Sequence, residues 1–138
     1  MQTFLPYEDF WLSANVLDTK RLCKQIIEAK IIYDINTSGD TKRAWYNHPA
    51  TKMWRGHDAA LATYFNTCLK VWKSRGYKHK YKFIIPSHIP THVEFLPQFI
   101  GHEGFHRSHQ SNLVRKNPEY YKGFFPDVPD NLPYIWEV

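Results

Sequence analysis

Cysteine and long apolar stretches are scarce in this sequence of 138 residues. Its two cysteines, Cys23 and Cys68, are far apart and both fall in segments with helical periodicity. This spacing offers neither a disulfide framework nor a zinc cluster, and it is typical of a reduced intracellular protein. No stretch approaches the length of a membrane span, and the N-terminus lacks the basic and apolar regions of a signal peptide. These absences predict a cytoplasmic protein without a membrane partner.

Common motifs for nucleophilic catalysis are also missing. The chain has no Gly-x-Ser-x-Gly sequence and no glycine-rich loop that could hold a phosphate. Any catalysis must therefore use less obvious groups. A free terminal amine with a carboxylate beside it is one sufficient pair, because an α-amine with a pKa of about 8 is partly neutral at pH 7 and can form an imine.

Positive charge and aromatic side chains are abundant. The formal net charge is +5, the pI is about 9.2, and aromatic residues make up 17% of the chain. A basic chain favours polyanionic partners, and aromatic rings serve either as core or as surfaces on which bases stack. The composition therefore raises the expectation of a nucleic-acid partner without proving it.

The pattern of apolar residues predicts a mainly α fold, a compact single-domain bundle of about three helices spanning residues 1–138. It comprises an extended N-terminal arm to Trp11, a helix over 18–33 capped by Ser13 or Asp18, a helix from Pro49 to Gly76 and a helix over 102–116. Long proline-rich loops complete it. Residues 77–100 contain Pro86, Pro90 and Pro97 and a short strand-like piece over 80–85, and the tail is expected to be extended.

Glu28 is the only acid after Asp18 in the first of these helices, where it is surrounded by lysine and arginine. Two interpretations are open. A glutamate on a lysine-rich helix is commonly a surface residue, here pairing with Lys24 four positions earlier. Alternatively, a carboxylate among cations suits a site that handles anions.

Residues 102–106 read His-Glu-Gly-Phe-His and match the H-E-x-x-H pattern of zinc hydrolases. A third ligand could be His109 or His92. However, Gly104 weakens the helix where rigid ligand geometry is needed. The alternative is that these histidines bind phosphate or stack on bases.

A polar face of the helix over 102–116 is a candidate DNA-binding surface. His106, His109 and Asn112 share this face, and Arg115 and Lys116 add positive charge. The adjacent cluster Tyr120-Tyr121-Lys122 interleaves charge with aromatic rings, as an unstacked nucleotide requires. Arg55-Gly56-His57, inside the second predicted helix, adds a further candidate where glycine permits close backbone approach.

Several segments, in order, resemble the phage-type pyrimidine-dimer DNA glycosylases with abasic-site lyase activity, the dimer-specific endonuclease V family. The similar segments are residues 22–28, residues 49–57, Lys73-Ser74-Arg75-Gly76-Tyr77, His102-Glu103 with Asn112-Leu113, Pro118 and Tyr120-Tyr121-Lys122-Gly123. The length is also similar. The resemblance implies a compact helical fold in which the N-terminal arm passes between helices.

The resemblance also implies a mechanism. The terminal α-amine attacks the sugar C1′ and forms an imine, Glu28 stabilises the developing sugar cation, and β-elimination cleaves the strand. This chemistry acts on damaged or modified bases in DNA and needs no metal or other cofactor. The residues that would bind DNA are Arg21, Lys24, Arg55, His57, His106, His109, Asn112, Arg115, Lys116, Tyr120, Tyr121 and Lys122.

Two differences from the family concern the site itself. The family exposes a small residue at its mature N-terminus, whereas the bulky Gln2 that follows Met1 here disfavours removal of the methionine. The free amine is then that of Met1, one residue before the family's position, and it belongs to Gln2 only if Met1 is removed. Ile27 and Ile31 stand where the family has arginines beside its glutamate. A noncatalytic nucleic-acid-binding module and a zinc hydrolase using His102, Glu103 and His106 are the alternatives.

Overall fold

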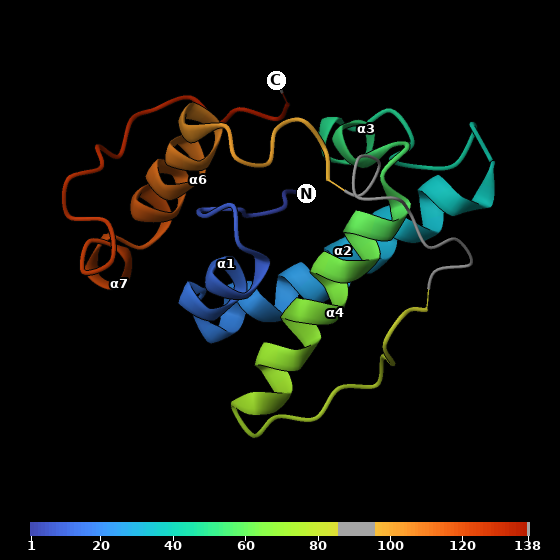
Figure 1. Ribbon diagram of the computed structural model, residues 1–138, viewed down its shortest axis with the longest axis horizontal. Helices are drawn as coiled ribbons and strands as arrows, with labels where there is room; N and C mark the ends of the chain where they lie inside the picture. The colour runs from blue at the N-terminus through green and yellow to red at the C-terminus, as the bar shows by residue number, and fades with distance from the viewer. Residues whose placement is uncertain (86–95, 138) are drawn as a thin grey trace.

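The computed structural model describes residues 1–85 and 96–137, a compact part of the chain with six helices and no β-strand (Figure 1). The helices are α1 (Phe10–Val16), α2 (Thr19–Ser38), α3 (Pro49–Trp54), α4 (Asp58–Ser74), α6 (Glu103–Lys116) and α7 (Pro118–Tyr121). The predicted mainly α fold is confirmed, with α2, α4 and α6 as its three long helices. Pro86, Pro90 and His92 lie outside the described residues.

The N-terminal arm is shorter than predicted. Helix α1 begins at Phe10, and the carboxylate of Asp9 caps it by accepting a hydrogen bond of 2.9 Å from the backbone nitrogen of Leu12. The sequence did not predict this helix, because polar residues interrupt the apolar ones in this short segment. Residues 1–9 therefore form the arm, and Ser13, a predicted cap of the next helix, lies inside α1.

Helix α2 continues five residues beyond the predicted end at Tyr33, to Ser38, and stops at Gly39, which has a φ of 73°. The polar residues of the last turn bond back to the helix, since the Thr37 hydroxyl donates to the Tyr33 carbonyl at 2.8 Å. Ile35 is buried there. Asp18 occupies the N-cap position, but its side chain makes no capping hydrogen bond.

The predicted helix from Pro49 to Gly76 is two helices, α3 and α4. The chain breaks at Gly56, whose φ of 84° is in the left-handed region that glycine adopts readily. The interpretation of Gly56 as a helix-interior residue is therefore wrong. The predicted strand-like piece over 80–85 is also not a strand. The backbone of Ile84 pairs with a side chain instead: the Ile84 nitrogen donates to the Asn66 side-chain oxygen, and the Asn66 side-chain nitrogen donates to the Ile84 carbonyl, both at 2.8 Å.

The most extensive contact between two helices joins α2 and α4, and the core continues from there to the arm, α1 and α6. Leu22, Ile26 and Ile32 on α2 are fully buried, as are Leu61 and Phe65 on α4. With the buried Ala29 between Ile26 and Ile32, they follow three- and four-residue steps, which place them on one face of each helix. Burying such side chains contributes about 1.5 to 3 kcal/mol each, so this interface is a main source of stability.

Neither cysteine forms a disulfide bond. Cys68 is buried in the core, and burial raises the pKa of its thiol to about 12. Cys23, on α2, is partly exposed. Among the described residues, no helix has the length and apolar character needed to cross a membrane.

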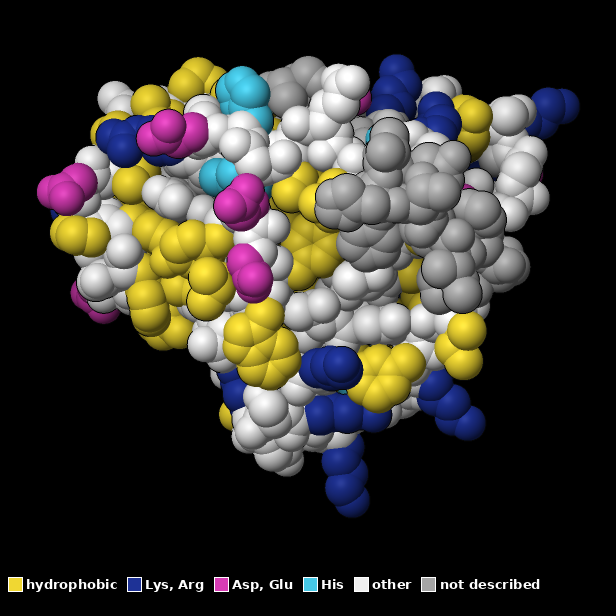
Figure 2. All heavy atoms as spheres, viewed as in Figure 1, with side chains coloured by type: hydrophobic (Ala, Val, Ile, Leu, Met, Phe, Trp, Pro, Cys, Tyr) yellow, Lys and Arg dark blue, Asp and Glu magenta, His cyan; other side chains and the backbone are white. Residues whose placement is uncertain are grey.

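Figure 2 shows that charge is unevenly distributed over one face of the molecule. Lysine and arginine side chains gather at its lower edge, around the C-terminal end of α4 and the segment after it, and again at the upper right. Aspartate and glutamate lie mainly on the opposite side, toward α1 and α6. A polyanion would thus meet favourable and unfavourable regions on this face.

Candidate active site

The N-terminal arm passes between α2 and α6 (Figure 1). Gln25 of α2, which is 1% exposed, holds it by accepting from the Phe4 nitrogen at 2.8 Å and donating to the Gln2 carbonyl at 3.0 Å. The indole nitrogen of Trp54 donates to the Thr3 hydroxyl at 3.1 Å. Because these partners are buried, each bond left unmade would cost about 1 to 3 kcal/mol, which fixes the arm.

Two histidines of α6 hold the other side of the arm. The Nδ1 of His106 lies 2.7 Å from the Leu5 carbonyl, and the Nδ1 of His109 accepts from the Leu5 nitrogen at 3.0 Å. The second nitrogens are also used, since His106 Nε2 accepts from the Gly101 nitrogen and His109 Nε2 contacts the Ile135 carbonyl. Both side chains are buried. The prediction that His106 and His109 form an exposed DNA-binding face is therefore wrong.

The zinc-site interpretation fails on the same geometry. His106 and His109 have both ring nitrogens in hydrogen bonds to the backbone, and His102 Nδ1 accepts from the Phe105 nitrogen at the start of α6. Among residues 1–85 and 96–137, no group of three or more histidine, cysteine, aspartate or glutamate side chains could hold a metal ion. The predicted ligand His92 lies outside these ranges.

The burial of His109 predicts a dependence of stability on pH. Burial, the main cause, lowers its pKa to about 3, whereas an unfolded histidine has a pKa of about 6.5. The neutral ring therefore stabilises the fold above pH 6.5, and this contribution is lost as the pH falls toward 3. We expect the unfolding free energy of the wild type to fall, relative to that of His109→Gln, by about 1.4 kcal/mol per pH unit in that window.

Urea denaturation of the two proteins between pH 4 and pH 7 measures this difference. The Gln variant should be less stable than the wild type at pH 7, because it loses the imidazole ring that packs between Phe105 and Tyr134. Parallel pH profiles for the two proteins would contradict the assignment of the titration to His109.

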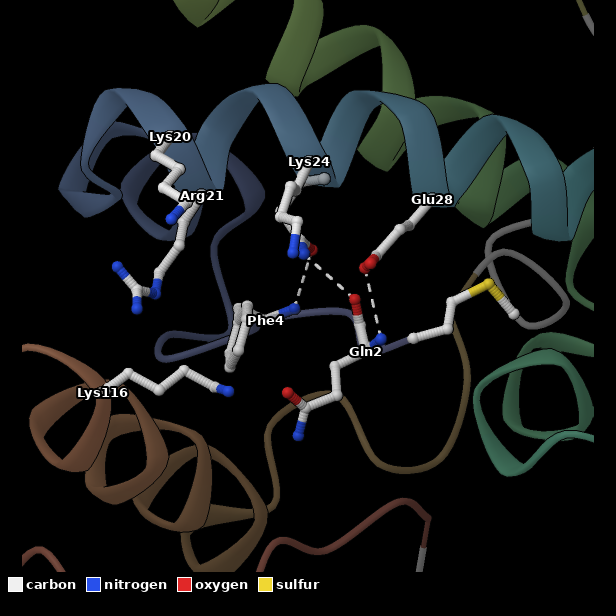
Figure 3. Close-up of a pocket in the computed structure, with 9 residues that line it drawn as sticks. Gln2, Phe4, Lys20, Arg21, Lys24, Glu28 and Lys116 are labelled. Carbon is white, nitrogen blue, oxygen red and sulfur yellow. Dashed lines mark hydrogen bonds between the residues drawn. The ribbon is translucent and has the colours of Figure 1, made fainter.

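The arm brings the backbone nitrogen of Gln2 to 3.2 Å from Glu28 Oε2 (Figure 3). Glu28 is partly buried, and no salt bridge joins it to Lys24 in the described part of the chain. The expected ion pair between Glu28 and Lys24 is therefore not formed. Its carboxylate faces the N-terminus instead.

A pocket surrounds this contact. Figure 3 shows Lys20, Arg21, Lys24 and Glu28 along α2, with Lys116 reaching toward the pocket from α6 on the other side of the arm. The pocket is lined by Met1, Gln2, Phe4, Lys20, Arg21, Lys24, Gln25, Glu28 and Lys116. Four cations and a single carboxylate thus face one space. Such a site attracts an anionic ligand and places one acid and the N-terminus against it.

The electrostatic environment of Lys116 reflects this concentration of cations. Partial burial and then repulsion from Arg21, Lys24 and Arg115 lower the pKa of its ammonium group. Arg21 is held by Asp18, with Nη1 3.3 Å from Oδ1. An incoming phosphate would relieve the repulsion among these groups, which favours anion binding here.

The other predicted DNA-binding residues lie elsewhere. Asn112 and Tyr121 are buried, and the Tyr121 hydroxyl donates to the Asp18 carboxylate. The Arg55 guanidinium stacks on the Tyr46 ring at 3.8 Å, and His57 takes the N-cap position of α4. Because Asn112 and Tyr121 are buried, the prediction that they contact DNA directly is wrong. Arg115, Tyr120 and Lys122 remain exposed.

Sequence reasoning missed two residues that shape the site. Gln25 fixes the arm, and Lys20 lines the pocket. A signal for Gln25 exists, because it is a polar residue among the apolar positions Leu22, Ile26 and Ala29 of one helix face. Nothing in the sequence distinguishes Lys20 from the other lysines of α2.

Residues 1–85 match a family model described as pyrimidine dimer DNA glycosylase. The matched part contains the arm, Gln25, Glu28 and the three cations of α2, whereas α6 with Lys116 lies beyond it. Neither the curated proteins nor the solved structures provide a significant match.

Proposed function

Because the chain belongs to the pyrimidine dimer DNA glycosylase family, we propose that it releases a damaged pyrimidine and then cleaves the strand as an abasic-site lyase. The observation that carries this proposal is the contact between the Gln2 nitrogen and Glu28 at the bottom of a cationic pocket. At this contact, the nitrogen of Gln2 and the carboxylate of Glu28 lie in the same pocket as the cations that could bind phosphate. DNA is the partner that these charges and the family support.

The proposed reaction begins when the terminal amine attacks C1′ of the damaged nucleotide. The bond between C1′ and the base breaks, its electron pair leaves with the base, and the base takes up a proton. Opening of the sugar ring then gives an imine between C1′ and the amine. Loss of a proton from C2′ forms a carbon–carbon double bond and expels the 3′ phosphate, and water finally hydrolyses the imine.

Glu28 acts on the charge that develops during base release. As C1′ loses the base, the sugar acquires positive character, and a fixed carboxylate beside it lowers the energy of that state. The same group lies 3.2 Å from the Gln2 nitrogen, where it can accept a proton from an attacking amine. Lys20, Arg21, Lys24 and Lys116 would hold the phosphates on either side of the nucleotide.

The amine itself belongs to Gln2 if Met1 is removed and to Met1 if it is retained. In the chain that begins at Met1, the nitrogen beside Glu28 is a peptide nitrogen, which cannot attack. Removal of Met1 would turn this same nitrogen into a free amine without displacing the arm, because Gln25 binds the carbonyl of Gln2 and the nitrogen of Phe4. The geometry therefore favours Gln2 as the reactive residue.

Borohydride trapping on duplex DNA with one abasic site tests the proposal. Reduction of the imine would join protein and DNA covalently, and peptide mapping should place the adduct at the N-terminal residue. Tight DNA binding without any adduct would instead support the alternative of a noncatalytic binding module. The exposed side chains of Ile27 and Ile31, at family arginine positions, are the feature that favours this alternative.

Replacement of Lys116 should weaken DNA binding through lost electrostatic attraction. We expect Lys116→Gln to reduce the slope of log K against log salt concentration by about 0.9, the value for one phosphate contact. Fluorescence anisotropy between low and moderate salt measures the slope. Lys70→Gln is the matched control, because Lys70 lies in a hollow shared with Glu8 and Asp9, which would repel a phosphate. Equal slopes for both variants would contradict the placement of DNA in the pocket.

A further inference from the structure

Trp45, in the loop between α2 and α3, combines exposure with an unfavourable backbone. It is 57% exposed, the largest value for a tryptophan in the described residues, and its φ of 70° is the one positive φ among the non-glycine residues there. A bulky side chain in this left-handed region is energetically unfavourable, and such outliers concentrate at functional sites. Core packing cannot account for this residue, because most of its ring faces solvent.

The loop holds Trp45 in place through its own backbone. The Tyr46 nitrogen donates to the Arg43 carbonyl at 3.1 Å, and the His48 nitrogen donates to the Trp45 carbonyl at 3.0 Å. Arg55 secures the loop from α3 by stacking on Tyr46 and donating to its carbonyl. The exposed ring is therefore presented by a fixed loop, which lowers the entropy lost when a flat ligand stacks on it.

The surroundings of Trp45 match the chemistry of a nucleic acid. Lys42 and Arg43 precede it on the same loop, and both are exposed. Arg43 donates to the Asp34 carbonyl at 3.2 Å, so its charge is fixed beside the loop. Basic residues that follow a backbone, next to an aromatic face on which a base can stack, are the combination used by proteins that bind unpaired nucleotides.

A row of rings connects Trp45 with the N-terminal arm. The ring of Trp45 lies 5.5 Å from that of His48, His48 lies 5.7 Å from Trp136, and Trp136 lies 4.4 Å from Tyr134. The Tyr134 hydroxyl donates to the carbonyl of Thr3 at 2.5 Å, next to Gln2. Burial and then the positive charge of the terminal ammonium lower the pKa of His48, which also places this row beside the N-terminus.

We propose that Trp45 is a stacking site for a nucleobase that leaves the duplex when DNA is opened at the lesion. The loop would hold the displaced base outside the helix while the pocket at Glu28 receives the damaged nucleotide. This inference rests on the proposed function for its substrate. It adds a binding residue that acts on the base, whereas the cations of the pocket act on phosphates.

Trp45→Gly tests the stacking role without endangering the fold. Glycine adopts the positive φ readily, and the hydrogen bonds of the loop come from the backbone, so thermal stability should be unchanged or higher. We expect affinity for an abasic-site duplex to fall about 5- to 150-fold, the range for one base stacked on an aromatic ring. Trp45→Phe should retain most of the affinity.

A 2-aminopurine placed either opposite the abasic site or beside it reports which base leaves the stack. Its fluorescence should be quenched in the wild-type complex and brighter in the Trp45→Gly complex, at one of the two positions. Trp11→Ala is the control, because Trp11 is 44% exposed and lies beside Glu8 and Asp9. That variant should behave as the wild type does.

The outcomes separate this inference from the proposed function. If the wild type forms a borohydride adduct but Trp45→Gly binds DNA as tightly and gives the same fluorescence, the stacking site is wrong and the function stands. If the wild type forms no adduct, the lyase proposal fails, while a loss of affinity and of quenching in Trp45→Gly still supports the stacking site.

Discussion

Glu28→Gln is expected to lower the rate of base release by about 10³-fold, within the range for removing one catalytic acid–base or charge-stabilising group. The amide cannot provide the negative charge that stabilises the sugar cation, nor can it take a proton from the amine. Its carbonyl oxygen can still accept the hydrogen bond that the Gln2 nitrogen now donates to Glu28 at 3.2 Å. The arm should therefore keep its position, and DNA affinity should change by no more than a few-fold.

Single-turnover base release from a duplex with one pyrimidine dimer, measured beside an anisotropy titration, separates these two effects. Glu119→Gln is the matched control, since Glu119 is an exposed acid on α7 and takes no part in lining the pocket. It should release the base at the wild-type rate. Unchanged release in Glu28→Gln would remove Glu28 from the mechanism.

A chain that begins at Gln2 is expected to form the borohydride adduct at least about 100-fold faster than a chain that retains Met1. The nitrogen beside Glu28 becomes a free amine in the first chain, whereas the amine of the second lies one residue away from it. Displacement of a reacting group by about 1 Å can already cost 10²-fold in rate. Peptide mapping of the adduct and the mass of each intact protein identify the reacting residue.

A third preparation, acetylated at the N-terminus, provides the control. It retains every lysine of the pocket, including Lys24 and Lys116, but lacks a terminal amine. We expect no adduct from it. An adduct that survives acetylation would transfer the role of nucleophile to a lysine, and equal rates with and without Met1 would contradict the assignment to Gln2.

Local features of the chain were predictable because they depend on neighbours in the sequence. Leu22, Ile26 and Ala29 recur at helical spacing, and all three are buried on α2. The Pro49 start of α3 and the Gly76 stop after α4 also follow from local backbone preferences. The break at Gly56 was missed, because a glycine inside a periodic pattern is compatible with either a continuous helix or a left-handed turn.

The face of α6 shows where local reasoning is insufficient. His106, His109 and Asn112 share one face, as predicted, but that face turns inward. The reason is that Leu5 of the arm offers a backbone donor and an acceptor that must be satisfied once they are buried, and the two histidines satisfy them. A polar helix face can contact solvent, a ligand or the buried backbone of another segment. The sequence does not distinguish these three surroundings, and only the tertiary structure does.

The sequence by itself determined a mainly α chain with excess positive charge, and it identified Glu28 as the acid in a basic helix. Only the tertiary structure decided what that acid meets. Glu28 and the Gln2 nitrogen are 26 positions apart, and their 3.2 Å contact exists because Gln25, His106 and His109 bind the backbone of the arm from two helices. Such a contact depends on several long-range hydrogen bonds at once, and no periodicity in the sequence records it.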